Sequence, residues 1–196
     1  MKKQCAAIIC LLLAIFAFSM PTFADDPVLT LKDGVSGEEM ALWPSSPEDG
    51  PEWLRYYNER FGFTVLVPHE IFRSVVTIPA NGDGFVLGNR IEKSLFRVSG
   101  GWAEFVDGGL RGSFENAKKA IGEENISYEE FSVGDTGDDY WELYWWENER
   151  FNIRRFVMNE EVWAECEISY PTIPNTEDPM NTIAYTAIQS LVLAKG

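Results

Sequence analysis

Few side chains in this sequence could act as a nucleophile, a general base or a transition-metal ligand. The chain has one histidine, His69, and three cysteines, of which only Cys166 lies beyond residue 24. A Ser–His–Asp or Cys–His site would have to use His69 with a serine such as Ser74 or with Cys166, and no serine stands in a Gly-x-Ser-x-Gly turn. One histidine and one cysteine also cannot supply the usual nitrogen and sulfur ligands of zinc. These residues predict no catalytic site, no metal and no cofactor.

Glu165 and Glu167 are the best spaced pair of carboxylates. In a predicted strand over 162–168 they share one face, about 7 Å apart by strand rise, a separation that glycoside hydrolases use. Acidic residues elsewhere continue the same character without any pocket residue, so a solvated acidic face is the favoured interpretation. A weak hydrolase that uses this pair or His69 is the alternative. Cys166 falls on the opposite, apolar face, which favours a small buried side chain over a reactive thiol.

Residues 135–139, Asp-Thr-Gly-Asp-Asp, could offer oxygen ligands to calcium. Their spacing lacks the alternating aspartates and the distant bidentate glutamate of a calcium loop. We therefore interpret this segment as a solvated acidic turn.

An unusually aromatic strand is predicted directly after this turn, over 140–146. Alternation gives it two aromatic faces, one with Tyr140, Tyr144 and Trp146 and one with Trp141, Leu143 and Trp145. A strand that is apolar on both faces is typical of a central strand between two layers. The alternative is that one face stays partly exposed and binds a partner, because Tyr and Trp are frequent interface anchors. An acidic rim would favour a basic protein. The residues selected for that surface are Asp135, Asp138, Asp139, Trp141 and Trp145.

The composition excludes several classes of partner. The chain has 31 Asp plus Glu against 16 Lys plus Arg, a formal net charge of −15. Such a chain is poorly suited to neutralise the phosphates of nucleic acid or to dock on anionic lipid. Its 196 residues, 45% of them hydrophobic, suit one compact domain with a substantial core.

Residues 1–24 have the pattern of a secretory signal. Lys2 and Lys3 precede an apolar run over 5–18, and Thr22-Phe23-Ala24 ends before Asp25. The run is shorter than the about 20 residues of a spanning helix. We expect cleavage after Ala24 and a periplasmic or secreted protein without a later membrane span.

The rest of the chain divides into an extended arm at 25–52, with one helical turn near 38–43, and a single domain at 53–196. A hairpin is predicted over 55–67, with strands at 55–57 and 61–67 around a turn at 58–60. Further short strands are predicted over 74–78, 85–87, 94–98 and 102–106, and longer ones over 126–133, 140–146, 151–158 and 162–170. Gly100-Gly101 and Gly108-Gly109 are interpreted as hairpin turns on either side of the strand over 102–106. One helix is predicted over 114–121, with Ser113 as N-cap and Gly122 as its end, and another from Pro179, with Asp178 as N-cap. This order predicts an α+β fold, a mostly antiparallel sheet flanked by helices.

The segment 56–68, Tyr-Tyr-Asn-Glu-Arg-Phe-Gly-Phe-Thr-Val-Leu-Val-Pro, resembles the opening of the PsbP-like family of secreted proteins. Asn81-Gly82-Asp83-Gly84, Tyr170-Pro171 and Ile188-Gln189-Ser190-Leu191 fit the same resemblance, which spans 53–194, whereas the arm and the bulky 140–146 stretch depart from it. The resemblance implies an α-β-α sandwich. Members of that fold are generally binding, assembly or accessory factors, so it also implies a non-enzymatic role without naming a partner.

We therefore expect an exported, non-enzymatic binding or accessory protein that engages a protein partner through an acidic, aromatic-bearing surface. One variant of this hypothesis is an inhibitor or immunity-type protein that caps a basic toxin or enzyme. The alternatives are the weak hydrolase and a structural component of the cell envelope.

Overall fold

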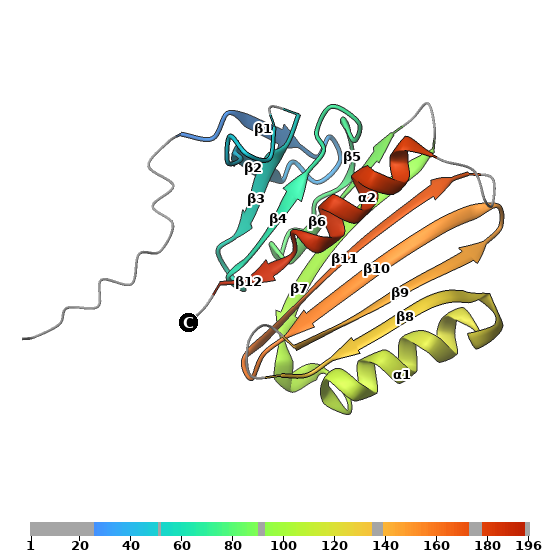
Figure 1. Cartoon of the computed structure of the whole chain (residues 1–196). Helices are drawn as coiled ribbons and strands as arrows, with labels where there is room; N and C mark the ends of the chain where they lie inside the picture. Colours follow the sequence, from blue (N-terminus) through green and yellow to red (C-terminus); the bar gives the residue numbers. More distant parts are fainter. Residues whose placement is uncertain (1–25, 51, 90–92, 135–138, 173–177, 195–196) are drawn as a thin grey trace, which may run out of the picture.

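The computed structural model describes residues 26–50, 52–89, 93–134, 139–172 and 178–194 (Figure 1). Over these residues the chain forms two antiparallel sheets and two α-helices, which confirms the expected α+β class and its helical flanks. The expected signal peptide lies outside the described residues. None of the helices within those ranges is long and apolar enough to cross a membrane.

A seven-stranded sheet forms the centre of the molecule. Its strands, in spatial order, are β5 (Ser74–Thr77), β6 (Gly84–Asn89), β7 (Ser94–Trp102), β11 (Val162–Pro171), β10 (Arg150–Met158), β9 (Asp139–Glu147) and β8 (Ile126–Ser132). Neighbours in this order are antiparallel. The four longer strands expected after residue 126 correspond to β8 through β11.

A five-stranded sheet contains the N-terminal part of the described chain. Its order is β1 (Leu29–Lys32), β2 (Glu39–Pro44), β3 (Leu54–Asn58), β4 (Phe63–Val67) and β12 (Val192–Leu193). The extended arm with a helical turn near 38–43 is therefore wrong, because β1 and β2 pair as a hairpin whose Met40 and Leu42 reach the core. The prolines and glycines around this segment mark the ends of strands rather than an arm without regular structure.

Two motifs that carry the PsbP-like resemblance meet in space. In the turn between β3 and β4, the Asn58 side chain accepts the Phe61 N–H at 2.9 Å and donates to the Gly82 carbonyl at 2.8 Å. Arg60 beside it donates to the Asn81 carbonyl at 2.6 Å and pairs with Asp83 at 2.7 Å. The 56–68 hairpin and the 81–84 turn are thus bound together by structural contacts.

One helix begins earlier than predicted and the other begins at its predicted N-cap. α1 (Gly109–Ile121) starts four residues before the expected Ser113 cap, because Gly108 and Gly109, both with positive φ, reverse the chain directly into the helix. A 3₁₀ turn, η1 (Ala103–Phe105), replaces the strand expected over 102–106, and a second, η2 (Glu123–Asn125), follows α1. α2 (Pro179–Gln189) begins as predicted, with the Asp178 carboxylate accepting the Met180 N–H at 2.8 Å.

The main core lies between the two sheets, and α2 extends its cover. Aromatic rings interlock there: Tyr56 contacts Phe85 edge-on at 4.9 Å, and Phe85 contacts Phe96 at 5.5 Å. Gly100 lies inside β7 rather than in a hairpin turn. A residue without a side chain is required there, because a Cβ would lie 2.6 Å from the Phe63 ring. The hairpin turn expected at 100–101 is therefore wrong.

A second, smaller core lies on the other face of the seven-stranded sheet. Phe114 and Ala117 of α1 pack there against β9 and β10. The central sheet is thus covered by α1 on one face and by α2 with the five-stranded sheet on the other (Figure 1).

Candidate functional site

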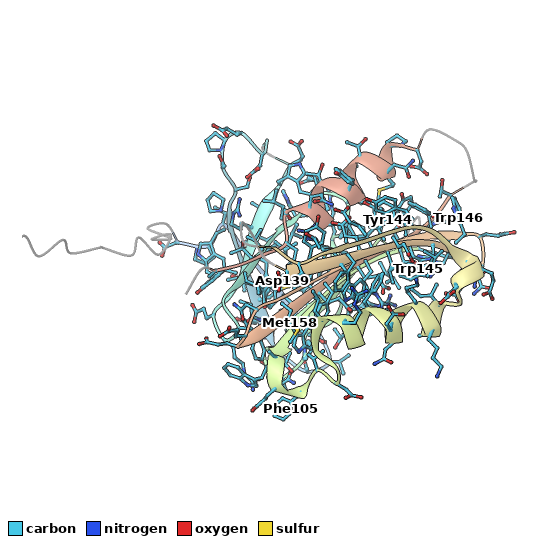
Figure 2. The ribbon with its side chains drawn as sticks, turned by 60° about the horizontal axis from the view of Figure 1, so that its bottom comes forward. Phe105, Asp139, Tyr144, Trp145, Trp146 and Met158 are labelled. Carbon is cyan, nitrogen blue, oxygen red and sulfur yellow. The ribbon has the colours of Figure 1, made fainter. Side chains whose placement is uncertain are left out.

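The aromatic strand β9 presents its two faces to different surroundings. Trp141, Leu143 and Trp145 point toward α1 and are almost completely buried, with Trp141 1% exposed. The Trp141 indole stacks on Phe156 and donates to the Ser113 hydroxyl at 2.8 Å. Figure 2 shows Trp145 on this side of the strand and Tyr144 and Trp146 on the other. The selection of Trp141 and Trp145 for a partner surface is wrong, because α1 covers both.

The opposite row, Tyr140, Tyr144 and Trp146, is only half-buried. α2 packs on β10 and β11, and among the described residues no further layer covers β8 and β9 on this side. Tyr128 of β8 is 44% exposed and lies 4.7 Å from Tyr144, and Tyr185 of α2 is 53% exposed. We call these five residues, Tyr128, Tyr140, Tyr144, Trp146 and Tyr185, the tyrosine face.

A partly buried carboxylate lies among these rings. Glu130 accepts hydrogen bonds from the hydroxyls of Tyr128 and Tyr140, each at 2.6 Å. These two bonds stabilise the ionised carboxylate and lower the pKa of Glu130. The same bond to Glu130 raises the pKa of Tyr128 to about 12, so both hydroxyls remain donors near neutral pH.

A buried ion pair lies deeper on the same side. Glu142, 1% exposed, pairs with Arg155 of β10 and accepts from Gln189 of α2 at 2.6 Å and from the Tyr144 hydroxyl at 3.1 Å. The Arg155 guanidinium also lies 3.9 Å from the centre of the Tyr140 ring. Burial, followed by the charge of Glu142, raises the pKa of Tyr144. The network therefore fixes α2 and the rings of Tyr140 and Tyr144 in one arrangement.

The sequence does not single out this face, because both rows of β9 are aromatic and the pattern does not tell which one α1 covers. The signal that could have found it is the polar residue Glu142, which shares a face with Tyr140 and Tyr144. Of the selected aspartates, Asp135 and Asp138 lie outside the described residues. Asp139 begins β9, where its carboxylate accepts the Gly134 N–H at 3.2 Å.

The residues considered for catalysis are either buried or paired with a neighbouring charged group. Cys166 is fully buried in the main core, and burial raises the pKa of its thiol. The His69 Nε2 lies 3.1 Å from the Glu70 carboxylate at the end of β4. Arg154 lies between Glu167, at 2.8 Å, and Glu165, at 3.9 Å. Burial raises the pKa of Glu165.

Potential metal ligands do not gather either: over the described ranges, no three His, Cys, Asp or Glu side chains lie close enough to hold an ion together. The tyrosine face is the candidate site, because it brings exposed rings, their hydroxyls and the Glu130 carboxylate together on one surface. Comparison with known proteins adds no family, since no protein-family model matches the sequence and no curated protein is significantly similar to it.

Proposed function

We propose that this protein is an exported binding or accessory protein that engages a basic protein partner through its tyrosine face. The observation that carries the proposal is the pair of exposed rings, Tyr128 on β8 and Tyr185 on α2, on the surface that also holds Tyr144 and the carboxylate of Glu130. Rings of this kind bury a large area at little cost in conformational entropy, and their hydroxyls give directional hydrogen bonds.

The charge of the chain supports a basic partner. A net charge of −15 attracts a cationic protein over long range and accelerates the encounter. The resemblance to the PsbP-like family supports the same class of function, since members of that fold generally act as binding or assembly factors. An inhibitor or immunity-type role, in which the tyrosine face caps a basic toxin or enzyme, is the most specific form of the proposal.

The test is capture of partners from the native envelope by the immobilised mature protein. We expect a captured protein to be lost when Tyr128 and Tyr185 are both replaced by Ser. Phe105→Ser is the matched control, because Phe105 is 77% exposed but lies on η1, outside the tyrosine face.

The captured partner should also bind less tightly as salt rises, because screening weakens attraction between opposite charges. A partner that the double variant retains as well as the wild-type protein does, or whose binding ignores salt, contradicts the proposal.

A further inference from the structure

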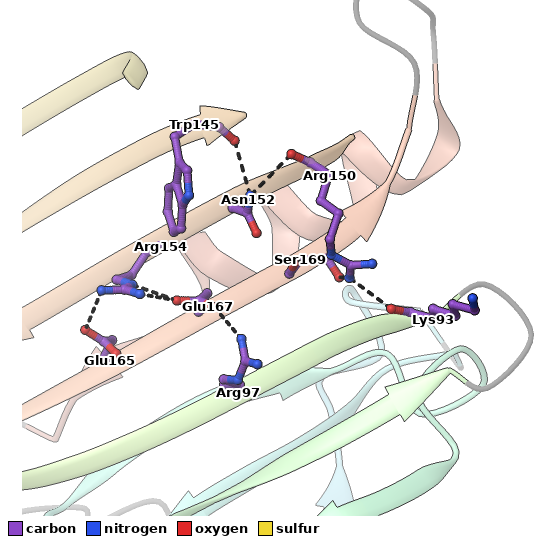
Figure 3. Close-up of polar contacts among 9 residues, drawn as sticks. All are labelled: Lys93, Arg97, Trp145, Arg150, Asn152, Arg154, Glu165, Glu167 and Ser169. Carbon is purple, nitrogen blue, oxygen red and sulfur yellow. Dashed lines mark hydrogen bonds and ion pairs between the residues drawn. The ribbon is translucent and has the colours of Figure 1, made fainter. Parts of the chain in front are cut away.

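A cluster of charged and polar side chains lies on the face of the seven-stranded sheet opposite the tyrosine face, which is the face that α1 covers in part. Strands β7, β11 and β10 contribute it, in the part of this face that lies outside the small core under α1 (Figure 3). The members are Arg97, Arg150, Asn152, Arg154, Glu165, Glu167 and Ser169. Three guanidinium groups thus share this surface with two carboxylates, in a chain whose overall charge is strongly negative.

The two carboxylates form ion pairs with two of the three arginines and not with the third. Arg154 contacts both Glu165 and Glu167. Arg97 donates through Nη1 to Glu167 at 2.6 Å, and its side chain is 47% exposed. Over the described residues, Arg150 has no carboxylate within ion-pair distance. Its hydrogen bonds run from Nε to the Ser169 hydroxyl at 2.8 Å and from Nη2 to the carbonyls of Ser169 and Lys93, each at 2.9 Å.

These bonds hold the Arg150 guanidinium in one orientation. A guanidinium has five N–H groups, and in the described structure the two on Nη1 donate to no protein oxygen. Ser169, which accepts from this guanidinium, is only 4% exposed and is therefore held rigidly, whereas Arg150 itself remains partly accessible. The donors of Arg150 are therefore fixed in direction before any ligand arrives.

Arg97 and Arg150 bind neighbouring side chains of β11, Glu167 and Ser169, which share one face of the strand about 7 Å apart by strand rise. The two positive charges therefore repel each other. Burial, followed by the charge of Arg97, lowers the pKa of the Arg150 guanidinium. An anion placed against both groups would relieve this repulsion and accept the free N–H groups of each. Arginine suits such a role because its planar fork matches the oxygens of a carboxylate or a phosphate.

We propose that Arg97 and Arg150 form a binding site for an oxyanion, either a carboxylate or a phosphate group. Because the chain as a whole repels anions, the site works through directed hydrogen bonds at short range rather than through a positive field. It lies on the face opposite the tyrosine face, so it stands or falls independently of the proposed function.

The test is calorimetric titration of the mature protein with sodium phosphate and, separately, with sodium acetate, against sodium chloride at the same ionic strength. We expect saturable binding of at least one oxyanion and none of chloride. Binding of phosphate alone identifies a phosphate site, and binding of acetate alone identifies a carboxylate site. Heats that match those of chloride in both titrations overturn the proposal.

Variants locate the site. Arg97→Gln and Arg150→Gln should each weaken binding about tenfold or more, the usual effect of losing a charge-assisted hydrogen bond. Arg111→Gln is the control, because Arg111 is an exposed cation on α1 that lies 3.8 Å from Glu115. If Arg150→Gln unfolds the protein, the exposed Arg97 decides the question alone. Equal weakening by Arg97→Gln and Arg111→Gln overturns the proposal.

Discussion

Glu142 and Arg155 are directly opposed on β9 and β10 and form an ion pair that is almost completely buried beneath α2. Gln189 of α2 bonds to both partners, donating to Glu142 at 2.6 Å and accepting from Arg155 at 3.2 Å. The end of the last helix is thus attached to the central sheet by polar contacts as well as by its apolar stripe. The ion pair also lies directly beneath the rings of the tyrosine face.

Glu142→Ala should destabilise the protein by about 3–5 kcal/mol, because it leaves the Arg155 charge buried without its partner. Replacing both residues together with apolar ones of similar volume, as in Glu142→Leu with Arg155→Met, should cost much less, since no charge then remains buried. Urea unfolding followed by circular dichroism measures both free energies. Equal loss in the single and double variants would show that the pair contributes through packing alone.

The turn between β9 and β10 contains a residue in an unfavourable conformation. Asn148 and Glu149 connect Glu147 to Arg150 with φ values of 50° and 61°, the two-residue turn with positive φ at both positions that favours Asn followed by Gly. Glu149→Gly should therefore stabilise the protein by about 1 kcal/mol by removing the Cβ from the left-handed conformation. Glu147→Gly is the control, because Glu147 lies just before the turn, as the last residue of β9. It should destabilise by about 0.5–1 kcal/mol in the same urea experiment.

The sequence predicts those elements whose ends carry local signals. Asp178 and Pro179 fix the start of α2, Gly122 ends α1, and Asn58 marks the turn between β3 and β4. It fails where a signal has two interpretations. A pair of glycines ends a hairpin in many proteins, whereas here Gly100 lies within β7, where the Phe63 ring occupies the space of a side chain.

The candidate surfaces depend mainly on contacts between distant segments. Glu142 marks its row of β9 as the more polar one, but the position of α1 decides that Trp141 is buried while Tyr144 is half-exposed. The oxyanion site is further from local prediction. Arg97 and Arg150 share a surface because β7 pairs with β11 and β11 with β10, a neighbourhood that strands distant in the sequence create only on folding.

Asp33 should make the stability of the protein depend on pH under acidic conditions. Its carboxylate, buried in the β1–β2 turn, accepts backbone N–H bonds from Val35 at 2.8 Å and Ile78 at 2.9 Å. These bonds lower the pKa of Asp33 from 3.8 to about 2. A carboxyl group with a lowered pKa in the folded state stabilises the fold above its unfolded pKa, and this stabilisation disappears as pH falls from about 4 to about 2.

Thermal unfolding between pH 2 and pH 7 measures this dependence. Asp33→Asn should unfold at a lower temperature than the wild-type protein at pH 7, and the difference should shrink toward pH 2. Asp26→Asn, an exposed aspartate before β1, is the control. A difference that stays constant over the whole range would mean that Asp33 acts through its shape and not through its charge.

The packing of Phe63 against β7 predicts a steric effect at Gly100. A Cβ at this position would lie 2.6 Å from Cε1 and 3.1 Å from Cδ1 of Phe63, and 3.1 Å from the Trp163 carbonyl oxygen. Since Phe63 is fully buried and the neighbouring group is backbone, neither can move away easily. Gly100→Ala should therefore destabilise the protein by about 1–3 kcal/mol, the usual cost of overfilling a core.

Gly34→Ala is the control, because nothing lies within 4 Å of a Cβ there, and its free energy of unfolding should change little. Combining Gly100→Ala with Phe63→Leu should recover part of the loss, since the smaller side chain makes room for the methyl group. If the double variant loses the sum of the two single effects, the close approach of the two sheets at this point is not what excludes a side chain from position 100.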